Sequence, residues 1–494
     1  MMRHAFDNEK YVELQSARIM ERVEQFQDKL YLEFGGKLFD DYHASRVLPG
    51  FEPDSKVKML ENLADEAEIV IVINANDIEK NKKRDDYGIT YDADVLRLID
   101  AFHSRGLYVG SVVVSRFANQ PSAVAFQKKL EKLGIRVFHH YTIEGYPSNV
   151  FSIVSDEGFG KNDYIETSRK LVVVTAPGPG SGKMATCLSQ LYHDSKLGLK
   201  SGYAKFETFP IWNLPLKHAV NLAYEAATAD LEDVNMIDPF HLEAYGETTV
   251  NYNRDVEIFP VLRETFIHIL GYCPYKSPTD MGVNMAGFCI VDNDAAVAAS
   301  RCEIIRRYFN AQCKVRKGEG DPKEVSKLEL IMHQAGILLT ERPIVDAARK
   351  KEEETDGPSA AIELPDGRIV TGKTTPLLGA ASAALINALK VSAGIPDRIK
   401  LISKYMIEPI QELKTKYYGS NNPLLHIDEI LLALSVCAIQ DSNAAAALEQ
   451  LPNLQGSDMH SSVILSSVDM NSLKRLGLTV TCEPKYETNR FFYN

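Results

Sequence analysis

Short apolar runs and amphipathic helical patterns alternate along the first 180 residues. The runs at 68–73 and 107–114 are rich in β-branched residues, and the apolar positions of 95–102 between them recur at helical spacing. Further apolar runs predict strands at Ile135–His139, Val150–Val154 and Leu171–Thr175. Strands this apolar, separated by helices, are typical of a parallel sheet covered on both faces. The pattern therefore predicts an α/β fold whose N-terminal part is a doubly wound parallel sheet.

The pattern changes twice further along the chain. From about residue 251 it is mostly helical, and the run ARKKEEETDGPSA at 348–360 combines charges, Gly and Pro as linkers do. Beyond it, Asp366-Gly367 between short apolar runs predicts a β-hairpin, and the chain closes with predicted strands at 463–467 and 478–482. We therefore expect three regions: a doubly wound α/β domain at 1–250, a helical region at 251–355 and a C-terminal α/β domain at 356–494.

Length, composition and charge fit this multidomain picture. The 494 residues exceed an ordinary single domain of ~150 residues about threefold. The content of 45% hydrophobic and 25% charged residues is that of a globular protein. The net charge of −12 argues against binding of nucleic acid by bulk electrostatics, so no nucleic-acid partner is expected.

The lack of a recognisable secretory signal and the cysteine usage both indicate a cytoplasmic protein. The start, MMRHAFDNEK, has no apolar h-region, and the apolar stretch at 375–395 contains Ser382, Asn387 and Lys390, which favours a buried helix over a membrane span. The seven cysteines are an odd number without a C-x-x-C pair, which indicates free thiols in a reducing compartment. No His/Cys cluster has zinc-ligand spacing, so neither zinc nor membrane contact is expected.

The segment most informative about chemistry is LVVVTAPGPGSGKMATCLSQLYHD, from Leu171 to Asp194. A buried strand leads into the glycine loop Gly178–Lys183, and a helix follows. Glycines allow backbone N–H groups to approach an anion, the helix N-terminus adds unpaired donors, and a lysine adds a charge that reaches outer phosphates. This order is that of a P-loop. We therefore predict binding of ATP or another phosphate-bearing ligand, with Lys183 in the catalytic role. The predicted binding residues are Gly178, Gly180, Ser181, Gly182, Lys183 and Met184.

The match to the P-loop pattern G-x-x-x-x-G-K-[ST] is incomplete. Pro177 stands where the first Gly belongs, and Met184 replaces the Ser or Thr that holds Mg²⁺, so the pattern permits Mg²⁺ without requiring it. The alternative is a tight strand-to-helix turn whose glycines serve packing and whose lysine is solvated. Asp238 is a candidate for the second acidic motif of a P-loop enzyme, and an ordinary loop aspartate is the alternative there.

Three strings resemble one uncharacterised bacterial protein family, a domain of unknown function, over the whole chain. They are TAPGPGSGKMATCLSQ, IVSDEGFGKNDYIET and LEFGGKLFDDYHASRVLPGF. This resemblance implies a cytoplasmic bacterial protein and brings no activity with it. The glycine loop by itself is similar to the phosphate loops of ATP-dependent ligases such as formate–tetrahydrofolate ligase, but it departs from them directly after Lys183.

The hairpin and helix at Ile362–Leu385 resemble the hairpin and first active-site helix of cytidine deaminases. Asp366-Gly367 and Gly372 match the hairpin, whereas the helix offers 380–382, Ala-Ala-Ser, in place of a zinc ligand and a catalytic Glu. The resemblance implies a shared fold without zinc ligands and without deaminase chemistry. A common hairpin followed by a helix is the alternative.

These features favour a nucleotide-dependent enzyme, a ligase or phosphotransferase acting on a small metabolite, with a small-molecule phosphate ligand as its partner. Two alternatives stay open: an enzyme that binds a phosphometabolite without nucleotide hydrolysis, and a non-catalytic ligand-binding or scaffold protein. A homo-oligomer is compatible with each. Mg²⁺-dependent turnover of ATP separates the first interpretation from the other two.

Overall fold

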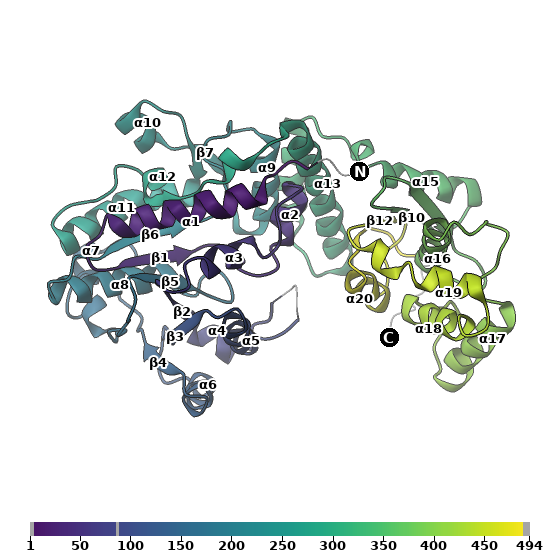
Figure 1. Ribbon diagram of the computed structural model, residues 1–494, viewed down its shortest axis with the longest axis horizontal. Coiled ribbons are helices and arrows are strands. Elements are labelled where there is room, and N and C mark those ends of the chain that lie inside the picture. The colour runs from purple at the N-terminus through teal and green to yellow at the C-terminus, as the bar shows by residue number, and fades with distance from the viewer. Residues whose placement is uncertain (1–3, 85–87, 488–494) are drawn as a thin grey trace. The chain divides into compact units, whose positions relative to one another are not determined.

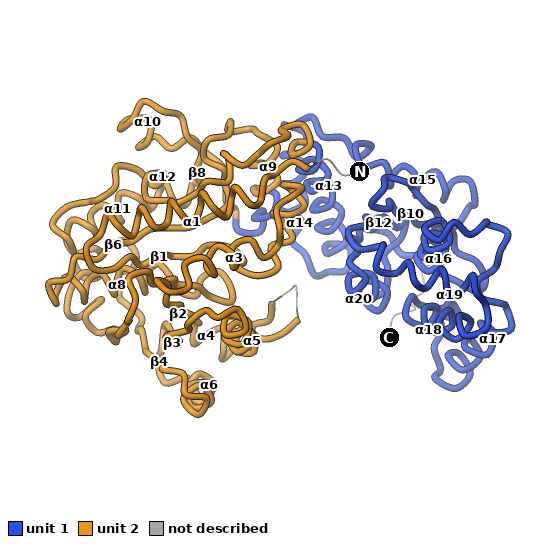
Figure 2. The backbone as a smooth tube through the Cα atoms, in the orientation of Figure 1, with its two compact units in different colours: residues 1–3, 226–231, 298–494 blue, residues 4–225, 232–297 orange. Residues whose placement is uncertain are grey.

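The computed structural model describes residues 4–84 and 88–487, which form two compact units (Figure 2). The N-terminal unit comprises residues 4–225 and 232–297. The C-terminal unit comprises residues 226–231 and 298–487. The division of the sequence into 1–250, 251–355 and 356–494 stays a prediction.

The N-terminal unit is built on a seven-stranded sheet in the order β4-β3-β2-β5-β1-β6-β9, and all its strands are parallel (Figure 1). The strands are β1 (Leu30–Phe34), β2 (Ala67–Asn74), β3 (Tyr108–Ser115), β4 (Arg136–His139), β5 (Leu171–Thr175), β6 (Gly202–Phe206) and β9 (Gly282–Val283). The central pairing aligns Tyr31 of β1 with Val172 of β5 and Tyr203 of β6. The predicted α/β fold with a parallel N-terminal sheet is confirmed.

Helices cover both faces of this sheet because its central strands are apolar on both sides. Ile69, Ile71 and Ile73 of β2 belong to one core, whereas Val70 and Val72 belong to the other. The first core includes residues of α1 (Asn8–Glu24), α3 (Ser55–Glu61), α5 (Tyr91–Ser104) and α6 (Pro121–Lys132). The second includes residues of α7 (Val150–Ile153), α8 (Lys183–Lys196), α11 (Asn253–Leu270) and α12 (Pro278–Met281).

Shorter elements complete this unit. The short helices are α2 (Tyr42–Val47), α4 (Ala75–Glu79) and α10 (Pro239–Tyr245), and α9 (Ala219–Ala227) runs to the edge of the unit. The antiparallel pair β7 (Asn235–Ile237) and β8 (Val250–Tyr252) forms a separate two-stranded sheet.

The C-terminal unit contains a four-stranded mixed sheet in the order β11-β10-β12-β13. Its strands are β10 (Ser359–Glu363), β11 (Ile369–Lys373), β12 (Asp458–Ser461) and β13 (Thr479–Cys482). Its helices are α13 (Asn293–Lys317, whose first turns belong to the other unit), α14 (Pro322–Gln334), α15 (Pro343–Thr355), α16 (Ala380–Ser392), α17 (Lys404–Glu412), α18 (Ile427–Cys437), α19 (Ser442–Leu448) and α20 (Ser467–Arg475). The predicted hairpin is present as β10 and β11, with Gly367 in the left-handed region at φ 86°.

Two predicted strands are wrong. Residues 150–153 form the short helix α7 because the side chain of Asn149 caps its amides, and an apolar run this short fits a helix as well as a strand. Residues 463–466 lead into α20 instead of forming a strand, and Ser466 caps that helix. The strand of this region is β12, whose polar sequence Asp-Met-His-Ser is fully buried and therefore escapes a criterion based on apolar runs.

Candidate functional site

The carboxyl edge of the seven-stranded sheet gathers the loops that follow β1, β2, β3, β5 and β6. The connection after β2 leads outward to β3, whereas the connection after the adjacent β5 crosses β1 to reach β6. The chain thus leaves neighbouring strands in opposite directions. In open α/β sheets, ligands bind in the crevice at this switch point, outside the carboxyl ends of the strands. The glycine loop follows β5 and lies at this position.

The glycine loop turns the chain from β5 into α8 through left-handed backbone. Gly180 has φ 73° and Gly182 has φ 97°, a region that favours glycine. Gly182 is the N-cap of α8 and offers no side chain to cap it. The first amides of a helix have no carbonyl of an earlier turn as acceptor, so those at the start of α8 remain available to a ligand.

Neighbouring strands hold this loop in place. The hydroxyl of Ser115, at the end of β3, donates to the carbonyl oxygen of Ser181 at 2.6 Å. The hydroxyl of Ser181 donates to the carbonyl oxygen of Gly178 at 2.7 Å. A Cβ at Gly178 would lie 2.3 Å from the hydroxyl oxygen of Tyr91, so only glycine fits there. The loop is a preformed structure in which the Ser181 side chain serves the loop itself.

The first turn of α8 places Lys183 and Met184 in different surroundings. Lys183 is half-buried, and within the part of the chain that the structure describes no carboxylate pairs with it. Met184 packs against the apolar core beneath α8. The hydroxyl oxygen of Thr186 lies 3.4 Å from Nδ1 of His140, and burial lowers the pKa of this histidine to about 4, so its ring is neutral. No side chain of this turn replaces the Mg²⁺-binding Ser or Thr.

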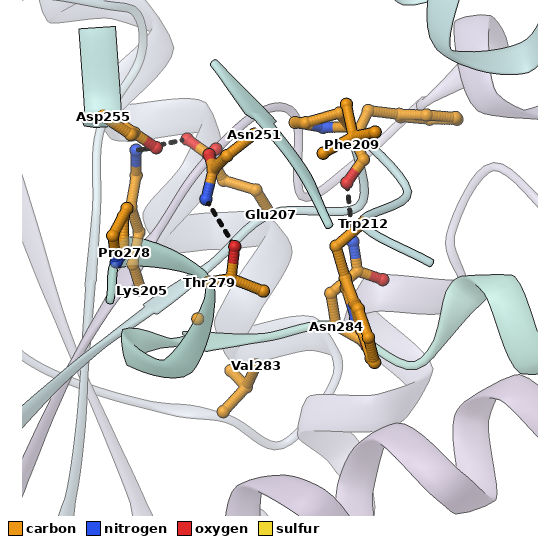
Figure 3. A pocket seen from close by; sticks show the side chains of 13 residues that line it. Lys205, Glu207, Phe209, Trp212, Asn251, Asp255, Pro278, Thr279, Val283 and Asn284 are labelled. Atoms are coloured by element: carbon orange, nitrogen blue, oxygen red, sulfur yellow. Dashed lines mark hydrogen bonds and ion pairs between the residues drawn. The ribbon is translucent and has the colours of Figure 1, made fainter. Parts of the chain in front are cut away.

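Three charged side chains meet at the end of β6, two strand positions away from the glycine loop. Lys205 lies in β6, Glu207 follows it, and Asp255 lies in the first turn of α11; we call them the lysine cluster (Figure 3). Nζ of Lys205 lies 2.5 Å from Oδ2 of Asp255 and 3.0 Å from Oε1 of Glu207. Burial acts to lower the pKa of Lys205, but the two carboxylates outweigh it and raise this pKa. Burial raises the pKa of Glu207 to about 7, against the attraction of Lys205. Glu207 can therefore exchange a proton near neutral pH.

The lysine cluster lines a polar cavity of about 50 Å³, which has room for a few water molecules. Asn251 donates to the hydroxyl of Thr279 at 3.3 Å (Figure 3). That hydroxyl donates to Oδ2 of Asp238 at 2.7 Å, and Asp238 also accepts hydrogen bonds from the first amides of α10. The second acidic residue considered for a P-loop enzyme is thus engaged in a helix cap and in holding Thr279, which lines this cavity.

Glu33 lies on the strand between the glycine loop and the lysine cluster. It lies near the end of β1, the strand between β5 and β6, and accepts a hydrogen bond from the hydroxyl of Tyr203 at 2.7 Å. Strands are spaced ~4.8 Å apart, so the glycine loop and the lysine cluster follow strands about 10 Å apart. A small metabolite spans this distance. The edge therefore presents the glycine loop with the uncapped start of α8 at one end and the carboxyl group of Glu207 at the other.

Two further glycines serve close packing. Gly35, after β1, packs directly against Glu207, since a Cβ there would lie 2.5 Å from its Cγ. Gly372 allows β11 to pack against α16, where a Cβ would lie 2.1 Å from the amide nitrogen of Ala384. Sequence reasoning missed Glu33, Lys205, Glu207 and Asp255. The usable signal was a charged residue at the end of an apolar strand.

Residues 4–84 and 88–487 contain no group of three or more His, Cys, Asp or Glu side chains that could hold a metal ion. They also contain no helix both long and apolar enough to cross a membrane.

The chain is similar to known proteins over nearly its whole length. Residues 4–336 match the family model described as "Domain of unknown function DUF1846, N-terminal", and residues 340–492 match "Domain of unknown function DUF1846, C-terminal". The UPF0371 proteins of Streptococcus pneumoniae strains CGSP14 and JJA are each 57% identical over 492 residues, covering 100% of both chains. The same figures hold for UPF0371 protein spr0309 of strain ATCC BAA-255 / R6. These names state no activity.

Proposed function

The chain belongs to the family described as domain of unknown function DUF1846, and on the geometry of its N-terminal unit we propose that it is an enzyme acting on a small phosphate-bearing metabolite. The glycine loop binds the phosphate group. Lys183 and the open amides of α8 supply the positive charge and the donors. The observation that carries the proposal is the left-handed, uncapped start of α8 beside Lys183 at the switch point of a parallel sheet.

The lysine cluster supplies the chemical step in this proposal. Glu207 has a pKa of about 7 and therefore exists in both protonation states near neutrality. Lys205 keeps Asp255 and Glu207 at hydrogen-bond distance and fixes their position. The metabolite lies across the end of β1, with its phosphate on the loop and its reacting group toward Glu207.

A second candidate is the ATP-dependent ligase or phosphotransferase that the strand–loop–lysine–helix order favours. Met184 stands at the position of the Mg²⁺-binding hydroxyl and packs into the core, so a bound nucleotide would need Mg²⁺ ligands from elsewhere. This observation favours binding of a substrate phosphate over binding of a nucleotide triphosphate. Nucleotide hydrolysis is therefore the second candidate function.

Calorimetric titration of the full chain with ATP, ADP and inorganic phosphate, with and without Mg²⁺, tests the proposal. At least one probe should bind the wild type. Lys183→Ala removes a charge-assisted hydrogen bond worth about 1.5–3 kcal/mol, so Kd should rise about 10- to 150-fold. The matched control is Lys170→Ala, because Lys170 precedes the same strand β5 and is exposed at the opposite edge of the sheet.

The outcomes separate the candidates. Binding that does not depend on Mg²⁺, lost in Lys183→Ala and kept in Lys170→Ala, supports the phosphometabolite enzyme. Mg²⁺-dependent turnover of ATP supports the second candidate. Binding of no phosphate compound by the wild type, or equal binding by both variants, contradicts the role of the glycine loop.

A further inference from the structure

The C-terminal unit contains a cavity of about 490 Å³, which we call the C-terminal cavity. Its wall is formed by the start of α16 at 379–382, by the segment before α18 at 420–426, and by the segment 463–469 that enters α20. It shares no residue with the glycine loop or the lysine cluster. Pockets for small molecules are typically ~300–1,000 Å³, so this cavity has the size of a ligand site.

A histidine–aspartate pair stands in the wall of this cavity. Nδ1 of His426 lies 2.9 Å from Oδ2 of Asp469. The same carboxylate accepts from the hydroxyl of Ser466 at 2.8 Å and from the amide of Ile427 at 2.8 Å. Burial acts to raise the pKa of Asp469, but the hydrogen bond and charge of His426 outweigh it and lower this pKa. Asp469 is therefore ionised and accepts from a protonated Nδ1.

This pairing leaves Nε2 of His426 for a ligand. The hydrogen bond that His426 donates to Asp469 raises the pKa of His426, while its burial and the charge of Lys414 act to lower this pKa, and Glu429 acts in the same direction as Asp469. The raised pKa extends the charged form of the ring to higher pH. In its neutral form Nε2 accepts a hydrogen bond, and in its charged form it donates one. A hydroxyl group of a ligand can form a hydrogen bond with either form of the ring, because it is both a donor and an acceptor.

The remaining wall is polar but lacks cations. Hydroxyl and amide groups line it, among them those of Ser420, Asn422 and Ser467, together with apolar side chains such as Leu425 and Val463. Among the described residues of the wall there is no Lys or Arg, whereas carboxylates are present. A phosphate or polycarboxylate would find no Lys or Arg among the described wall residues to compensate its charge. An uncharged molecule with both apolar and hydroxyl groups matches the wall.

We propose that the C-terminal cavity is a second ligand site, which binds an uncharged, hydroxyl-bearing small molecule of the nucleoside or sugar class through Nε2 of His426. The site is independent of the proposed phosphate site. Loss of phosphate binding in Lys183→Ala should leave it intact, and failure of either proposal does not entail failure of the other.

The experiment is calorimetric titration of the full chain with adenosine, uridine and D-glucose, and with inorganic phosphate as the anionic probe, at pH 6 and pH 8.5. We expect at least one uncharged probe to bind with similar affinity at both pH values. His426→Leu removes the hydrogen bond to the ligand, so Kd should rise about 2- to 10-fold. His333→Gln is the matched control, because His333 is an exposed histidine of the same unit on α14.

A second variant tests the site without disturbing the His426–Asp469 pair. Ser467 is exposed in the cavity wall, so Ser467→Trp should fill the cavity and abolish binding while the melting temperature stays near that of the wild type. Three outcomes would overturn the proposal. These are no binding of any uncharged probe at millimolar concentration, binding that survives both His426→Leu and Ser467→Trp, and binding of phosphate that strengthens at pH 6 and is lost in these variants.

Discussion

Each unit has a charge cluster in its interior, and the two clusters have opposite composition. In the N-terminal unit, one cation, Lys205, lies between two carboxylates. In the C-terminal unit, one carboxylate, Asp458, lies between Arg306 and Arg342, which we call the arginine cluster. Arg342 donates to both oxygens of Asp458, at 3.0 and 2.8 Å, and Arg306 donates to Oδ2 at 3.0 Å.

The two compositions have different consequences for proton exchange. Burial acts to raise the pKa of Asp458, but two guanidinium groups outweigh it and hold the value at about 2. This carboxylate stays ionised at every physiological pH, so the arginine cluster is a structural element. Burial raises the pKa of Glu207 to about 7 and Asp255 adds to this, against the attraction of Lys205. A buried carboxylate held by two guanidinium groups thus stays ionised, whereas one that shares a single lysine with a second carboxylate becomes able to transfer protons.

Asp458→Ala should have the largest effect on stability. It leaves Arg342 without its buried carboxylate and leaves Arg306 with Glu303 alone, and a guanidinium cannot lose its proton. Breaking a buried pair in this way costs about 3–5 kcal/mol of unfolding free energy. Chemical denaturation followed by circular dichroism measures this cost. Asp366→Ala is the control, since Asp366 pairs with Arg368 at the surface, where solvent screens the pair, and its loss should change stability far less. Equal effects of both variants would contradict a structural role for the arginine cluster.

Lys205→Met should have a smaller effect that depends on pH. The variant leaves Glu207 and Asp255 without their cation. A buried carboxyl group can avoid the cost of an unpaired charge by binding a proton. We expect a loss of about 1–3 kcal/mol at pH 8 and a smaller loss at pH 5, measured by denaturation at both pH values. A loss that does not change with pH would show that these carboxyl groups do not take up protons.

Glu207→Gln should have the smallest effect at pH 5, where the folded-state carboxyl group is protonated, and it isolates the titrating group. The folded-state pKa of Glu207, about 7, exceeds its ordinary value of 4.5, so the folded state binds more protons between these pH values. The contribution of Glu207 to stability therefore falls as pH rises from 4.5 through 7. The shift from 4.5 to about 7 corresponds to about 3 kcal/mol at ~1.36 kcal/mol per pKa unit, and the variant should remove this difference. Melting temperatures of both proteins at pH 5 and pH 8 give the measurement, and parallel profiles would contradict the raised pKa.

Local features of this protein could be predicted from its sequence. The β-branched run at Glu68–Ile73 lies within β2, and Asp366-Gly367 forms the turn of the β10–β11 hairpin. The glycine loop joins a strand to a helix as its sequence indicates. Each of these depends on periodicity or turn chemistry within a few residues of the chain. Where the local signal was ambiguous, as at 150–154, or absent, as in the polar strand β12, the prediction was wrong.

The candidate sites depend on contacts that no local pattern contains. Glu33, Lys205 and Asp255 come together because β6 pairs with β1 and the start of α11 packs beside them. No single segment of the sequence indicates this strand order. His426 and Asp469 are 43 residues apart and meet only where the starts of α18 and α20 adjoin. The sequence by itself determined the elements and the glycine loop, because these follow from short-range sterics and the spacing of apolar residues. The tertiary structure alone decided which charges face each other, because burial and pairing depend on long-range packing.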